Sequence, residues 1–155
     1  MKVRRKIKDS FSYAIAGIVY ALKTQRNMRV HFTIALAVLF FSSFFNLSNF
    51  ELLALFFAIV LVILSEMINT AIEATVDILT EKYHSKARIA KDVAAGAVLT
   101  AVLNSIIIGL VIFLNKINQF FPNIKLIAGQ STLHLIFIFI AAFFLIGAII
   151  LALFS

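Results

Sequence analysis

The fold of this chain is decided by residues 66–77, Glu66-Met67-Ile68-Asn69-Thr70-Ala71-Ile72-Glu73-Ala74-Thr75-Val76-Asp77, which directly follow a long apolar run. At 100° per residue in a helix, the three acids and the amide fall on one stripe, and the other residues face other ways. An acid near the middle of a membrane costs about 2.5–3.5 kcal/mol on insertion scales. The stripe therefore indicates a site that handles a metal ion or protons, with a polar seam between packed helices as the alternative.

The composition is that of an integral membrane protein. Of the 155 residues, 63% are hydrophobic and 14% are charged, and the apolar residues lie in long blocks. The absence of cysteine excludes disulfide and thiolate chemistry. The net charge is +7, but the basic residues cluster at segment ends, which indicates contact with a membrane surface and does not favour nucleic acid as a partner.

The first 23 residues predict an amphipathic helix that lies in the membrane interface. One helical face carries apolar residues (Ile7, Phe11, Ile15, Ile18 and Leu22) and the other carries polar ones (Lys6, Asp9, Tyr13, Tyr20 and Lys23). A signal peptide is not expected, because basic residues follow the apolar stretch and no convincing cleavage site precedes a soluble sequence. The polar face either serves a plain anchor or covers a site at the membrane surface.

Four spans are expected after this helix, at about residues 32–45, 50–77, 93–114 and 132–154. A polar hinge at 25–31, a tight turn at 46–49, a charged connector at 80–88 and a loop from 115 to 130 separate them. We expect Asn104 and Ser105 to form interhelical hydrogen bonds, and the small residues at 94–97 to allow close helix packing. The chain is thus divided into a membrane domain, 1–114, and a loop with an additional span, 115–155.

The distribution of lysine and arginine predicts the topology. Eight precede the first span, none lies between spans one and two, four lie between spans two and three, and two lie between spans three and four. The first segment and the connector should therefore be cytoplasmic, and four spans return the C-terminus to the cytoplasm. The acidic stripe then emerges on the cytoplasmic side, where ATP and Mg²⁺ are available.

The residues at that surface leave two kinds of chemistry open. No Walker motif, zinc motif or glycine loop is present. Mg²⁺ binds through one or two carboxylates plus substrate phosphates, and a second carboxylate can act as general base on an alcohol. Lys91, next to Asp92, can neutralise phosphate charge. The residues permit a phosphotransferase acting on a membrane-embedded alcohol, and they also permit a proton or cation pathway.

A family resemblance favours the first of these. The order Glu66-x-x-Asn69-Thr-Ala-Ile-Glu73-x-x-x-Asp77, then Tyr83-His84, Ala90-Lys91-Asp92 and Ala97-Val98-Leu99, closely resembles the prokaryotic diacylglycerol kinase family, which includes undecaprenol kinases. The resemblance covers about residues 6–114, and residues 26–31 are more similar to the undecaprenol kinase branch. It implies a surface helix and three spans in a homotrimer, in a bacterial-type inner (plasma) membrane, with the active site at the cytoplasmic face.

The resemblance also implies roles for individual residues. Glu66 matches the catalytic base, Asn69 a site residue beside it, and Glu73 a ligand of Mg²⁺ and nucleotide. The expected nucleotide contacts are Lys6, Tyr13, Glu73, Lys82, Tyr83, His84, Lys91 and Asp92. Gln25 stands where the family has a second metal carboxylate, and its amide oxygen coordinates a metal more weakly. The fourth span is an addition to the short family members.

We therefore expect a lipid kinase that uses ATP and Mg²⁺ to phosphorylate the hydroxyl of undecaprenol or diacylglycerol. The alternatives are a small proton- or cation-conducting membrane protein that uses the same carboxylates, and a structural membrane subunit with a polar seam.

Overall fold

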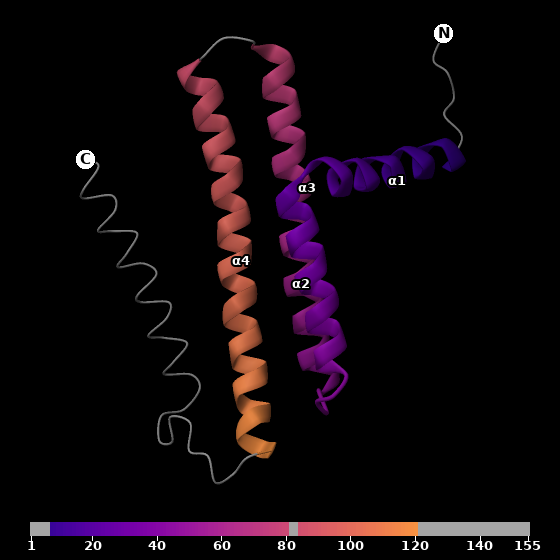
Figure 1. Cartoon of the computed structure of the whole chain (residues 1–155), viewed down its shortest axis with the longest axis vertical. Coiled ribbons are helices and arrows are strands. Elements are labelled where there is room, and N and C mark those ends of the chain that lie inside the picture. The colour runs from indigo at the N-terminus through magenta and orange to yellow at the C-terminus, as the bar shows by residue number, and fades with distance from the viewer. Residues whose placement is uncertain (1–6, 81–83, 121–155) are drawn as a thin grey trace, which may run out of the picture.

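Four α-helices make up the part of the chain that the computed structural model describes, residues 7–80 and 84–120, and this part contains no β-strand. They are α1 (Ile7–Thr24), α2 (Arg26–Ser42), α3 (Asn49–Leu79) and α4 (Ser85–Phe120). α3 packs against both α2 and α4, while α1 contacts α2 and α3 and projects from them at a steep angle, away from α4 (Figure 1). The last part of α3 and the first part of α4 continue past the level of α1 as a helical hairpin (Figure 1).

A sharp elbow joins α1 to α2, and only Gln25 departs from helical geometry there, with φ −96° and ψ 122°. Arg29 Nη1 donates a hydrogen bond to Lys23 O at 2.9 Å, so a side chain of α2 satisfies a carbonyl at the end of α1. The predicted polar hinge over residues 25–31 is therefore wrong beyond Gln25, because residues 26–31 form the first turns of α2. These residues include no glycine or proline, so nothing in them breaks a helix.

The start of α3 is fixed by a capping box. Ser48 Oγ accepts a hydrogen bond from Glu51 N at 3.3 Å, and Glu51 Oε2 accepts one from Ser48 N at 2.6 Å. Lys116 Nζ lies 3.1 Å from the same Glu51 Oε2 and ties the start of α3 to the last turns of α4. This ion pair lies at the end of the helices opposite to the acidic stripe. The connection into α3 covers residues 43–48, so it begins earlier than the turn predicted at residues 46–49, and Asn49 is already the first residue of α3.

α3 and α4 approach each other through small side chains. Ala58, Ala94 and Ala101 are all at most 6% exposed, and small residues allow two helices to pack closely. α4 continues to Phe120, so the loop expected from residue 115 begins at least six residues later. The delay has a physical reason, because no residue from 115 to 120 breaks a helix, whereas Pro122 disfavours helix at the residue before it.

Two helices, Asn49–Leu79 and Ser85–Ile117, are long and apolar enough to span a membrane. Only 22% and 17% of their most apolar segments are buried inside the chain, so most of this apolar surface is left for lipid or another protein. The structure is thus that of a helical membrane protein. α2 has 17 residues, about 26 Å at 1.5 Å per residue, against roughly 30 Å of membrane hydrocarbon. A span there stays a prediction, as does the interfacial position of α1, and the expected fourth span lies outside the described residues.

Candidate active site

The acidic stripe on α3 runs from the interior of the chain to its surface. Glu66 is 2% exposed and Asn69 is 6% exposed, whereas Glu73 is half-buried and Asp77 is exposed. Seven residues of helix separate Glu66 from Glu73, which is about 10 Å along the axis. The stripe therefore offers one acid in an apolar interior and others progressively nearer to water, as the sequence predicted.

Hydrogen bonds link the middle of the stripe and leave its deeper atoms available. Asn69 Nδ2 donates to Glu73 Oε1 at 3.1 Å, which holds the Glu73 carboxylate against the helix. Glu66 Oε2 and Asn69 Oδ1 are buried and have no hydrogen-bond partner in the structure. An unsatisfied buried polar atom costs about 1–3 kcal/mol, and such atoms are few in folded proteins. Two of them one turn apart make this part of the stripe a candidate site for a ligand.

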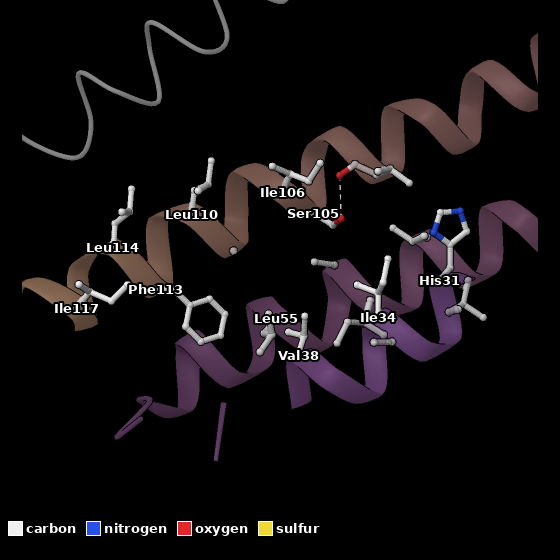
Figure 2. Close-up of a pocket in the computed structure, with 17 residues that line it drawn as sticks. His31, Ile34, Val38, Leu55, Ser105, Ile106, Leu110, Phe113, Leu114 and Ile117 are labelled. Carbon is white, nitrogen blue, oxygen red and sulfur yellow. Dashed lines mark hydrogen bonds between the residues drawn. The ribbon is translucent and has the colours of Figure 1, made fainter. Parts of the chain in front are cut away.

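An apolar groove of about 460 Å³ leads toward Glu66 between α2, α3 and α4 (Figure 2). Figure 2 shows His31 at one end of the groove, and Phe113, Leu114 and Ile117 at the other. Its walls are otherwise almost entirely aliphatic: Ile34, Ala35, Val38, Leu55, Ala58, Ile59, Val62, Ile63, Val102, Ser105, Ile106, Gly109 and Leu110. Val62 and Ile63 line the groove and stand about one turn before Glu66 on α3, so the groove extends to within about one helical turn of this residue.

Ion pairs join the hairpin near the outer end of the stripe. Lys91 Nζ donates to Asp77 Oδ1 and connects the first turns of α4 to the last turns of α3. Asp92 instead pairs with Arg88 on its own helix, with Nε and Oδ2 3.6 Å apart and both side chains exposed. Lys91 and Asp92 therefore have separate partners, and the Lys91 ammonium is directed to the acidic helix.

The remaining predicted site residues are spread around this centre. Tyr13 is exposed on α1, Gln25 is half-buried at the elbow, and His84 is exposed just before α4. Lys6, Lys82 and Tyr83 lie outside the described residues. The structure thus brings together Glu66, Asn69 and Glu73, while nothing in it shows the expected nucleotide contacts in use.

The oxygen donors present fit Mg²⁺ bound mainly through phosphate. Within residues 7–80 and 84–120, no three histidine or acidic side chains converge on a common point that could hold a metal ion. Mg²⁺ does not need such a cage, because it commonly uses one or two carboxylates plus substrate phosphates and water. Glu73 supplies a carboxylate, and the unpartnered Asn69 Oδ1 supplies a second hard oxygen beside it. The Gln25 side chain makes no capping hydrogen bond at the start of α2.

Two residues of this region were misjudged from the sequence. His31 was assigned to a hinge, but it lies on α2 and lines the groove. Ser105 was expected to bond to another helix, but Ser105 Oγ donates to Val102 O at 2.8 Å within α4, so that expectation is wrong. The sequence did contain a signal for His31: it is the one ionisable residue in the otherwise uncharged stretch between Arg29 and Glu51.

The sequence comparisons agree with this architecture. The family model described as prokaryotic diacylglycerol kinase matches residues 12–113, which include the acidic stripe and the helices around it. The chain is 44% identical over 101 residues to a diacylglycerol kinase of Synechocystis sp., covering 64% of this chain and 58% of that protein. It is also 44% identical over 108 residues to an undecaprenol kinase of Bacillus subtilis, covering 70% of this chain and 88% of that protein. The match therefore spans less than two thirds of the Synechocystis protein and most of the Bacillus one. Because the family model covers most of the chain, this protein belongs to the prokaryotic diacylglycerol kinase family.

Proposed function

We propose that this protein transfers the γ-phosphate of ATP to the hydroxyl of a membrane lipid. One observation carries the proposal: the buried Glu66 carboxylate, with an oxygen that has no partner, lies about one helical turn beyond Val62 and Ile63, which line an apolar groove. Membership of the family supports it, because both relatives compared above are named as kinases of lipids.

In this proposal Glu66 is the general base. The lipid hydroxyl loses its proton to Glu66 Oε2 as its oxygen forms a bond to the γ-phosphorus. The bond from that phosphorus to the β–γ bridging oxygen breaks, and ADP leaves with the electron pair. A base must lie within hydrogen-bond reach of the proton that it removes, and a buried oxygen without a partner is available for such a contact.

Glu73 and Asn69 hold the nucleotide end of the reaction. The two oxygens, Glu73 Oε and Asn69 Oδ1, are the donors proposed for Mg²⁺, with Gln25 as a weaker neutral ligand. When bound, Mg²⁺ neutralises charge on the phosphate oxygens. Lys91, already directed to α3 through Asp77, adds positive charge on the same side of the hairpin. The further proposed nucleotide contacts are Lys6, Tyr13, Lys82, Tyr83, His84 and Asp92.

The groove is proposed to receive the hydrocarbon of the lipid. Its volume of about 460 Å³ is in the range of ligand pockets, and its walls offer apolar surface with polar groups near one end. Such walls recognise a chain without distinguishing its chemistry, and the two relatives are named for different lipids. We therefore propose undecaprenol or diacylglycerol as the substrate.

The assembly and the location belong to the same proposal. The apolar faces of α3 and α4 that remain exposed support a homotrimer embedded in lipid. We place it in a bacterial inner (plasma) membrane, with several spans and with Glu73 and Asp77 toward the cytoplasm. Residues 115–155 form an additional region with a fourth span in this proposal.

The test is transfer of ³²P from ATP to undecaprenol and to diacylglycerol by the purified protein in mixed micelles. Glu66→Gln keeps the size of the side chain but removes the base, so the rate should fall by about 10²–10⁴-fold. Glu51→Gln is the matched control, because it makes the same chemical change at the opposite end of α3. Equal rates for the two variants would refute Glu66 as the base. Proton or cation flux through liposomes, with no phosphorylation of either lipid, would support the conducting alternative instead.

A further inference from the structure

His31 is the polar residue at the end of the groove nearest to Glu66, and the proposed mechanism does not use it. It lies on the second turn of α2, is half-buried, and points its imidazole ring toward the groove end between α2 and α3 (Figure 2). The rest of the groove is almost entirely aliphatic. A histidine at this place therefore needs an explanation other than contact with hydrocarbon.

The segment of α3 beside the groove supplies that explanation. Val62 and Ile63 line the same groove as His31 about one turn before Glu66, so His31 shares the groove with the part of α3 that leads to this carboxylate. The basic side chains nearby have other partners: Arg29 donates to the end of α1, Lys91 to Asp77, and Arg88 pairs with Asp92. Among the residues that line the groove, His31 is the only ionisable one.

We infer that His31 is a positioning residue for Glu66: its ring N–H is directed to the carboxylate and holds Glu66 Oε2 toward the lipid hydroxyl at the end of the groove. Glu66 Oε2 has no hydrogen-bond partner in the structure. Catalytic hydrogen bonds are often long before substrate binds and tighten in the complex. The inference rests on the proposed function, since it gives Glu66 a fixed orientation only if Glu66 is the base.

Two substitutions separate this role from packing. His31→Leu removes the donor and suits an aliphatic groove, whereas His31→Gln keeps an N–H donor on a chain of similar reach. Loss of one hydrogen bond to a charged group corresponds to about a 10-fold fall in kcat for His31→Leu, with the KM for ATP unchanged. His31→Gln should recover most of the kcat, and added imidazole should partly restore a His31→Gly variant, which leaves space for the ring.

The measurement is lipid phosphorylation by the full chain in mixed micelles, with the thermal unfolding midpoint of each variant recorded alongside. Packing alone predicts that leucine works as well as or better than glutamine, and that result with folded variants would overturn the inference. An unchanged kcat in all three variants would overturn it too. Failure of the proposed function is distinguishable, because the protein with His31 intact would then phosphorylate no lipid at all.

Discussion

Asn69 offers the sharpest test of the proposed Mg²⁺ site. Its amide Nδ2 donates to Glu73 Oε1 at 3.1 Å, while its Oδ1 is buried without a partner. Asn69→Ala removes both groups and leaves Glu73 able to move between rotamers. Thr75→Ala is a suitable control, because the Thr75 hydroxyl also forms a hydrogen bond within α3, to Ala71 O, but on the exposed side.

The magnitude follows from what the hydrogen bond does. A hydrogen bond to a charged group contributes about 1.5–3 kcal/mol, and the lower value applies because Glu73 is only half-buried. Ordering a long side chain that has lost its tether costs a similar amount of rotamer entropy. We therefore expect Asn69→Ala to raise the Mg²⁺ concentration for half-maximal activity about 10-fold. Asn69→Asp should instead lower the Mg²⁺ concentration for half-maximal activity, because a second carboxylate beside Glu73 is stabilised by a cation between them.

The assay is lipid phosphorylation at saturating lipid and ATP, titrated with Mg²⁺. The reasoning would be refuted if Asn69→Ala lowered the maximal rate but left the Mg²⁺ dependence equal to that of Thr75→Ala. Asn69 would then serve Glu66 and the lipid hydroxyl, one turn deeper, and would not orient a metal ligand.

Two further predictions concern the groove and the opposite end of the helices. Gly109 lines the groove, and a Cβ there meets no atom within 4 Å, so Gly109→Phe should enter the groove and Gly109→Ala should not. Displacing two CH₂ groups of the lipid costs about 1.6 kcal/mol, or roughly 15-fold in the lipid KM for Phe, while Ala should match the unmodified protein. The Glu51–Lys116 pair, with side chains 26% and 12% exposed, should give a coupling of about 1–2 kcal/mol in a double-mutant cycle of thermal unfolding with Gln at both positions. A coupling near zero would show that the capping box alone fixes the start of α3.

The part of the site that lies on one helix could be predicted from sequence, because helical periodicity alone places its residues. Glu66, Asn69 and Glu73 recur every three or four residues, and the structure shows them on one face with burial decreasing toward Asp77. The family was recognised from the same residues, and the comparison confirms it.

What depends on contacts between helices could not be predicted in this way. The elbow at Gln25 is stabilised by Arg29, which donates a hydrogen bond to the end of α1, and residues 26–31 are helical although their polarity suggested a hinge. Because residues 25–31 were predicted to be a hinge, the position of His31 on the groove side of α2 could not be predicted from helical periodicity. For Ser105 the sequence predicted a contact between helices, but its hydroxyl donates a hydrogen bond to Val102 O within α4. Such a local hydrogen bond competes with any partner on another helix.

The order of burial along α3 explains why one continuous helix carries the whole stripe. The proposed lipid kinase must hold a reactant that dissolves in hydrocarbon and one that dissolves in water within bonding distance of each other. Glu66 is buried about one turn beyond groove residues of α3, Glu73 is half-buried nearer to the surface, and about 10 Å of rigid helix fixes the separation between them. A break in the helix between these residues would let the two halves move independently and would lose the near-attack geometry that makes the transfer effectively unimolecular. The stripe therefore needs a helix that crosses the boundary between the apolar interior and water without interruption, and α3 does so over 31 residues with its start fixed by the capping box and by Lys116.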